Sequence, residues 1–116
     1  MDAGDYSPAR VEEVITVGAS SFNDTMSYWS NFGGSVKILA PGENIISTWI
    51  NGGTQVLSGT SMAAPFVAGA AAYFFGRTND MTRDGVVTII EDTAVVDVLG
   101  GIREFYSSCC TLHSWF

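Results

Sequence analysis

One stretch of the sequence combines residue types that could carry out chemistry. It runs from Ser58 to Gly69, and it places the hydroxyl of Ser61 between a glycine-bearing turn and a run of small apolar residues. Free N–H groups and a partial positive charge at a helix N-terminus would stabilise negative charge that develops beside Ser61. Gly59 would let a substrate backbone approach closely. Ser61 is therefore a candidate nucleophile, although position alone favours a serine that only caps the helix.

Several short apolar and β-branched runs predict the strands that must hold this stretch in place. The predicted strands cover residues 14–19, 35–40, 44–50 and 54–58. The last two flank Asn51-Gly52-Gly53, whose composition favours a hairpin turn. Between the first two, residues 20–35 are rich in Ser, Asn and Gly and predict a long surface loop.

Two helices are predicted after the strands. Residues 61–75 are small and apolar on every side, which predicts a helix that is buried on every side. Pro65 falls in its first turns, where a missing N–H costs little. A second helix is predicted at 82–92, with Thr82 as N-cap and four apolar side chains facing inward, namely Val86, Val87, Ile89 and Ile90.

Composition limits the classes of protein to which the chain can belong. Its 116 residues allow one domain, and 47% apolar with 15% charged residues favours a packed core over disorder. A net charge of −7 without a basic cluster argues against a nucleic-acid partner. The apolar run 63–75 is too short to span a bilayer, and the first residues do not form a signal peptide. Cys109 and Cys110 are adjacent, without metal-ligand spacing.

The sequence around Ser61 also resembles a known family. Gly59-Thr60-Ser61-Met62-Ala63, followed by Pro65 and Val67-Ala68-Gly69, is similar to the nucleophile motif of the subtilisin-like serine proteases. The resemblance covers about residues 3–97. Upstream segments resemble successive segments of the proteinase K branch in order and spacing: Tyr6-Ser7-Pro8-Ala9, Val17-Gly18-Ala19-Ser20, Trp29-Ser30-Asn31-Phe32-Gly33, Ala40-Pro41-Gly42 and Ser47-Thr48-Trp49-Ile50.

The resemblance implies an α/β fold with a parallel sheet and a Ser-His-Asp endopeptidase. Ser61 would attack the scissile carbonyl of a protein or peptide substrate, with Gly59, Thr60 and Ser61 forming the motif and the backbone side of the oxyanion hole. It also implies a secreted, extracellular protein. Residues 1–100 would be the C-terminal part of a peptidase domain, and 101–116 a tail foreign to the family and poorly packed.

The chain differs from the family in the catalytic segments that it contains. The triad Asp, the triad His and the oxyanion Asn belong to segments that precede the position of Met1 in the family, so we expect an incomplete fragment that is inactive alone. One alternative is a non-catalytic fragment that binds protein by strand exchange. Another is an α/β-hydrolase-like esterase, using His113 with Asp92 or Asp97, although Ala63 stands where that fold has glycine.

No cofactor or metal is expected. The proteinase K branch commonly places a calcium-ligating aspartate where this chain has Lys37, beside backbone carbonyls near Glu12 and Val14. The ammonium of Lys37 would either take the space of the ion and pair with Glu12, or extend into solvent. Phe66 replaces a histidine that is common in the family but does not belong to the triad, so an apolar side chain is tolerable there.

Overall fold

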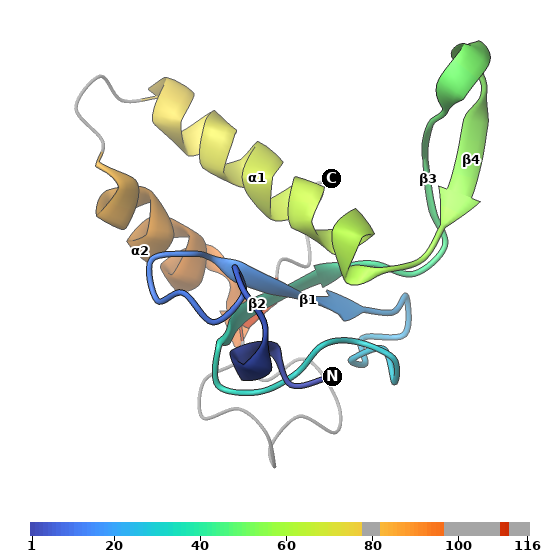
Figure 1. Ribbon diagram of the computed structural model, residues 1–116. Coiled ribbons are helices and arrows are strands. Elements are labelled where there is room, and N and C mark those ends of the chain that lie inside the picture. Colours follow the sequence, from blue (N-terminus) through green and yellow to red (C-terminus); the bar gives the residue numbers. More distant parts are fainter. Residues whose placement is uncertain (78–81, 97–109, 112–116) are drawn as a thin grey trace.

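A computed structural model describes residues 1–77, 82–96 and 110–111 of the chain (Figure 1). The predicted α/β class is confirmed: helices pack on a sheet whose central strands are parallel. The elements follow the chain as η1 (Ala3–Asp5), β1 (Thr16–Ser20), β2 (Val36–Pro41), β3 (Ile45–Thr48), η2 (Ile50–Gly52), β4 (Thr54–Leu57), α1 (Thr60–Arg77), α2 (Arg83–Thr93), β5 (Val95–Val96) and β6 (Cys110–Thr111), where η marks a 3-10 helix.

The main sheet has the strand order β1-β2-β6-β5. β1 and β2 are parallel: Thr16 pairs with Val36 at one end, and Ser20 pairs with Pro41 at the other. The register shifts between Thr16 and Val17. β6 adds to β2 in parallel, and β5 adds to β6 antiparallel. The two long strands β1 and β2 therefore end at the same edge, where the chain leads on toward the hairpin and α1 (Figure 1).

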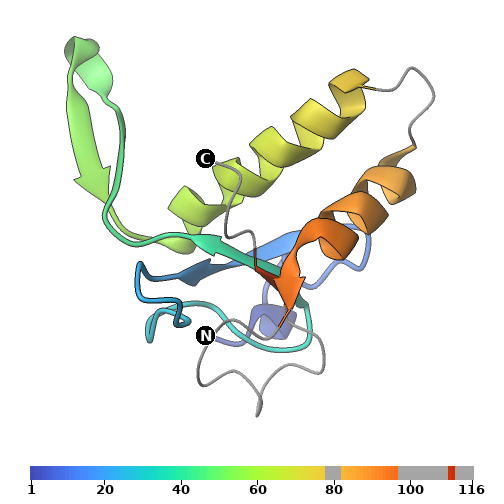
Figure 2. The same ribbon diagram turned by 180° about the vertical axis from the view of Figure 1, so that it is seen from behind.

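Both helices pack on the same face of this sheet, as the view from behind also shows (Figure 2). The core between them joins buried side chains of β1, β2, α1 and α2, namely Ala19, Ile38, Ala40, Ala63, Val67, Ala70, Val86 and Ile90, with Ala94 after α2. A second cluster, of Ala3, Val36 and Leu39, ties the N-terminal segment to β2. β2 is buried along most of its length because it contributes to both clusters.

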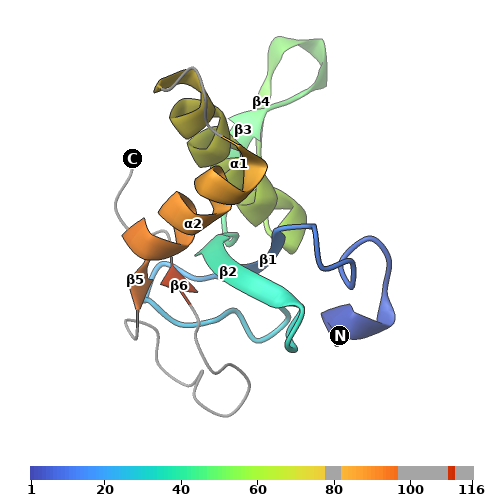
Figure 3. The ribbon, with the colours of Figure 1, turned by 90° about the vertical axis from the view of Figure 1, so that its left-hand side faces the viewer.

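α2 begins and packs as the sequence predicts. The Thr82 side chain accepts a hydrogen bond from the N–H of Gly85 at 3.2 Å, so Thr82 is the N-cap. Val86 and Ile90, four residues apart, are buried against α1 and the sheet, while Val87 and Ile89 are half-buried. Figure 3 shows α2 lying over the side of the sheet that β5 and β6 form.

The predicted burial of α1 on every side was wrong. The helix extends over 60–77 as expected, but it is not buried on every side: Ala63, Val67 and Ala70 are buried, and the opposite face is exposed. Tyr73 and Phe75 remain 49% and 45% exposed. The reason is geometric, because a helix lying on one sheet is covered on one face, and within the described residues no further layer covers the other.

The predicted hairpin is confirmed, with shorter strands than expected. β3 and β4 are antiparallel: Ile45 pairs with Leu57 at the base of the hairpin, and Thr48 pairs with Thr54 near its tip. The 3-10 helix η2 forms the turn between them. Asn51 and Gly52 adopt positive φ there, of 62° and 77°. The hairpin projects away from the main sheet (Figure 1), and most of its side chains are exposed.

Two expectations, on the packing of the tail and on membrane spans, can be compared with the described residues only. Of the tail 101–116, Cys110–Thr111 is described, and it forms β6 between β2 and β5. The expected poor packing of the other tail residues lies outside the described residues and stays a prediction. A search of the described residues for a helix long and apolar enough to cross a membrane found none.

The N-cap gives a stability prediction with a matched control. Thr82→Ala should lower the free energy of unfolding by about 1 kcal/mol, because the Gly85 N–H loses its acceptor. Thr88→Ala removes a hydroxyl that bonds back to the carbonyl of Asp84 inside the same helix and should change stability by less than about 0.5 kcal/mol. Urea unfolding of the two variants measures both; equal losses would contradict the capping role.

Candidate functional site

Ser61 lies where the predicted nucleophile should lie, in the first turn of α1. The helix begins at Thr60, and the Ser61 side chain is exposed to solvent. Its hydroxyl makes no hydrogen bond within the described residues, so it does not cap the helix. A serine that is presented at a helix N-terminus and left unbonded is available to a substrate and to a base.

Backbone contacts fix the turn that precedes Ser61. The N–H of Gly59 donates to the carbonyl of Gly42 at 2.8 Å, and the N–H of Gly42 donates to Ser20 at 3.0 Å. A Cβ on Gly42 would lie 2.6 Å from the Ala19 Cβ and 2.9 Å from the Gly59 carbonyl oxygen, closer than atoms tolerate. Glycine at 42 is therefore what allows the nucleophile turn to lie directly on the ends of β1 and β2.

Side chains hold the residues on either side of Gly59. The Ser58 hydroxyl accepts from the N–H of Asn44 at 2.9 Å, and Nδ2 of Asn31 lies 3.4 Å from the Thr60 hydroxyl oxygen. The sequence shows Asn31 only as part of a motif and does not reveal its contact with Thr60. A contact that joins residues 29 positions apart leaves no periodic signal in a single sequence.

The loop that carries Asn31 is itself anchored to β1. The Ser30 hydroxyl accepts from the N–H of Ala19 at 2.8 Å and donates to the carbonyl of Asn31 at 3.0 Å. Ser30 is 2% exposed, so these bonds form away from competing water. The chain of contacts from β1 through Ser30 and Asn31 to Thr60 therefore positions the start of α1 from a second side.

The first turn of α1 leaves donors free beside the hydroxyl. The N–H groups of Met62 and Ala63 both donate to the Gly59 carbonyl, at 3.0 and 3.3 Å. Those of Thr60 and Ser61 have no acceptor within the described residues, as expected for the first residues of a helix. Free N–H groups and the positive helix end give this position the electrostatics to stabilise an oxyanion.

A pocket opens directly beside Ser61. It has a volume of about 310 Å³, and it lies between the base of the hairpin and the first two turns of α1. Its lining is mostly apolar and consists of Ile45, Ile46, Ser47, Ser61, Met62, Pro65 and Phe66. Phe66 also packs against the main core, which agrees with the apolar role predicted for it. The pocket suits an apolar group next to the bond that Ser61 would attack.

Pro65 stands one helical turn after Ser61, within the first turns of α1 as predicted. It supplies no N–H, so the Ser61 carbonyl receives no donor from the position where a helix normally places one.

The residues of the esterase alternative are not brought to Ser61. Asp92 lies exposed near the end of α2, and it makes no contact with the Ser61 hydroxyl. Asp97 and His113 lie outside the described residues. Within residues 1–77, 82–96 and 110–111, no three His, Cys, Asp or Glu side chains come together as metal ligands would.

An exposed serine at the start of a helix packed on a parallel sheet is compatible with a serine hydrolase, and comparison with known proteins identifies the family. The chain belongs to the subtilase family, whose sequence model matches residues 3–107. The resemblance to the subtilisin-like serine proteases is confirmed, because curated relatives of the chain are subtilisin-like serine endopeptidases.

Particular relatives show how much of the family's length is present. A cuticle-degrading protease of Metarhizium anisopliae is 48% identical over 87% of this chain and 26% of its own length. Proteinase T of Parengyodontium album is 55% identical over 65% of this chain and 26% of its own. The crystal structure of a cold-adapted subtilisin-like serine proteinase superposes with a TM-score of 0.88 at 35% identity, over 97% of this chain and 41% of the other. The chain spans about a quarter of the length of these curated relatives.

The tight packing at Gly42 yields a prediction about the position of Ser61. Gly42→Ala should cost about 1–3 kcal/mol of stability, because the new methyl group overlaps Ala19 and the backbone of Gly59. Gly34→Ala is the matched control, since no atom lies within 4 Å of its Cβ, and it should change stability by less than about 0.5 kcal/mol. Thermal unfolding of both variants tests this; an unchanged Gly42→Ala variant would show that the turn does not lie on the strand ends.

Proposed function

We propose that this chain supplies the nucleophile, Ser61, of a subtilisin-like serine endopeptidase. The observation that carries the proposal is the local geometry: an exposed, unbonded hydroxyl lies at the start of α1, beside free N–H groups and an apolar pocket. Membership of the subtilase family supports the same role for the serine in the sequence Gly59-Thr60-Ser61.

The chemistry assigns a separate role to each group. The Ser61 hydroxyl attacks the scissile carbonyl, a base takes its proton, and the Ser61 N–H binds the oxyanion that forms. The described residues hold no base bonded to Ser61, so that base and its orienting carboxylate come from elsewhere. Without them, serine is a weak nucleophile at neutral pH, and we expect the 116-residue chain alone to be inactive.

The substrate class follows from the site and from the family. Protein chains are the substrates of proteases, and the apolar lining of the pocket favours an apolar side chain near the cleaved bond. The net charge of −7 supports the absence of nucleic-acid partners. A secreted, extracellular location is supported by a relative that is named for degrading cuticle.

A second function, binding to another protein without catalysis, is favoured by one observation. α1 and the hairpin expose large apolar side chains. Ile46, which also lines the pocket, is 67% exposed, and Ile50 is 73% exposed. Such a surface favours burial against another polypeptide. This alternative predicts binding without turnover.

Fluorophosphonate labelling distinguishes these functions. The purified chain alone should label slowly or not at all, because nothing removes the Ser61 proton. The chain should label rapidly and stoichiometrically after co-refolding with the N-terminal remainder of a subtilase domain, such as that of the cuticle-degrading protease. The family resemblance places the Asp, His and Asn segments in that remainder.

Two variants make the result specific to one hydroxyl. Ser61→Ala should abolish labelling of the reconstituted pair, while Ser35→Ala, at the opposite end of β2, should keep it. Binding of the remainder without labelling would favour the non-catalytic function. Rapid labelling of the chain alone, lost in His113→Ala, would favour the esterase alternative over ours.

A further inference from the structure

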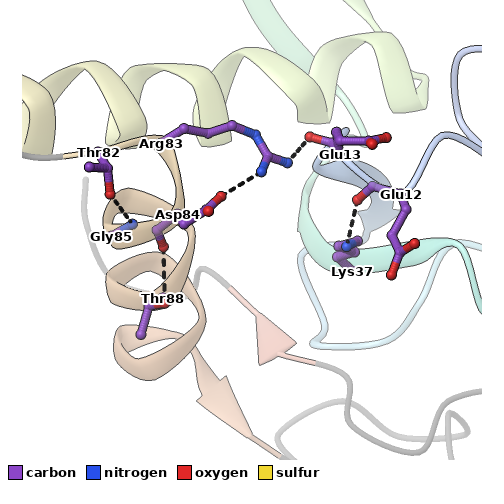
Figure 4. A network of polar contacts seen from close by, with 8 residues as sticks. All are labelled: Glu12, Glu13, Lys37, Thr82, Arg83, Asp84, Gly85 and Thr88. Carbon is purple, nitrogen blue, oxygen red and sulfur yellow. Dashed lines mark hydrogen bonds and ion pairs between the residues drawn. The ribbon is translucent and has the colours of Figure 1, made fainter.

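Two cationic side chains from different elements meet at the backbone of one turn (Figure 4). Nζ of Lys37, on β2, donates to the carbonyl of Glu12 at 2.9 Å. The guanidinium of Arg83, at the start of α2, donates to the next carbonyl, that of Glu13. Neither carbonyl accepts a backbone N–H within the described residues. The turn at 12–13 therefore takes both of its described donors from side-chain cations.

Lys37 bonds to the backbone and not to a carboxylate. Figure 4 shows its ammonium directed at the Glu12 carbonyl oxygen, while the Glu12 carboxylate points elsewhere. The sequence analysis left two orientations of Lys37 open, and this contact is the one that ties it to Glu12. An ammonium bonded to a carbonyl is a charge-assisted interaction, stronger than the same bond from a neutral donor.

Arg83 connects the turn to α2. One of its nitrogens contacts Asp84 at 2.7 Å, and another binds the Glu13 carbonyl. The pair with Asp84 holds the guanidinium in place, and the fork of donors lets one side chain serve both acceptors. The turn at 12–13 is thus linked to β2 through Lys37 and to α2 through Arg83, although 70 residues separate Glu13 from Arg83.

The residues at this corner do not fit the calcium ion that the family resemblance implies. Calcium is bound by six to eight oxygen ligands, which carboxylates and carbonyls supply. Here an ammonium stands at position 37 and bonds to the Glu12 carbonyl, so it withdraws a ligand oxygen and adds a repelling charge. Within the described residues no cluster of acidic side chains compensates for it.

We propose that Lys37 and Arg83 replace a metal at this corner: these two tethered cations link the 12–13 turn to β2 and α2, and the turn takes no calcium. A tethered cation needs no free ion, so the stability of this corner is independent of the calcium concentration. Because both contacts are exposed, raised salt screens them and weakens the link.

Thermal unfolding of the purified 116-residue chain tests the proposal, with calcium chloride or EDTA present. The wild-type midpoint should be the same in both. Lys37→Met should lower the midpoint by about 4 °C, since it removes one charge-assisted bond. Arg83→Met should lower it by at least as much, since it removes the bond to Glu13 and the exposed ion pair with Asp84. Arg77→Met is the matched control, because Arg77 contacts Tyr73 of its own helix, and its midpoint should stay near that of wild type. A wild-type midpoint that rises with calcium, or Met variants that match the control, would overturn the proposal.

A measurement on the unsubstituted chain does not depend on the folding of any variant. Lys37 is the one lysine in the sequence, so an amine-reactive acetylating ester has two targets, its side-chain amine and the α-amino group of the chain. Mass spectrometry of the peptide that contains residue 37 then measures how accessible the Lys37 ammonium is. We expect Lys37 to react several-fold more slowly in the native chain than in urea, with the same rate in calcium and in EDTA. Equal rates in native and urea-unfolded chains would place the ammonium in solvent and refute its proposed contact with the 12–13 turn.

Discussion

The position of the candidate nucleophile depends on one close backbone contact, between Gly59 and Gly42. The hydrogen bond of 2.8 Å joins the turn before Ser61 to the end of β2, and the absence of a side chain at Gly42 allows the approach. β2 is buried here because its side chains belong to two hydrophobic clusters. The strand end therefore sets the place where α1 begins, and α1 sets the direction of the Ser61 hydroxyl and its neighbouring N–H groups.

The same arrangement leaves one face of α1 without a covering layer in the described part of the chain. One face of α1 is buried against the sheet and α2, while the other exposes Tyr73, Phe75 and a row of small residues. The chain spans about a quarter of the length of its curated relatives, yet it superposes on a subtilisin-like proteinase with a TM-score of 0.88. Within the described residues, α1 therefore carries both the Ser61 hydroxyl, which has no bonded base, and a helix face that no other layer covers.

Sequence reasoning predicted the elements better than their surroundings. Residue patterns predicted α1, α2 and the strands β1 to β4 to within a few residues, but not β5 and β6. Thr82 was identified as a cap because capping is local chemistry. It failed on the burial of α1, because periodicity reports the preference of a side chain and not the presence of a covering layer. It also missed the Asn31–Thr60 contact and the Arg83–Glu13 contact, which join residues far apart in the chain. Ser61 was identified from its motif, whereas its pocket needed the fold.

Amide hydrogen exchange at single-residue resolution tests the central claim most directly, because that claim concerns which N–H groups beside Ser61 are bonded. The account predicts slow exchange for the Gly59 amide, which donates to Gly42, and fast exchange for the amides of Thr60 and Ser61, which have no acceptor within the described residues. NMR spectra of the 15N-labelled chain would resolve these signals. Fast exchange at Gly59, or a Ser61 amide protected as strongly as the interior of α1, would contradict the account.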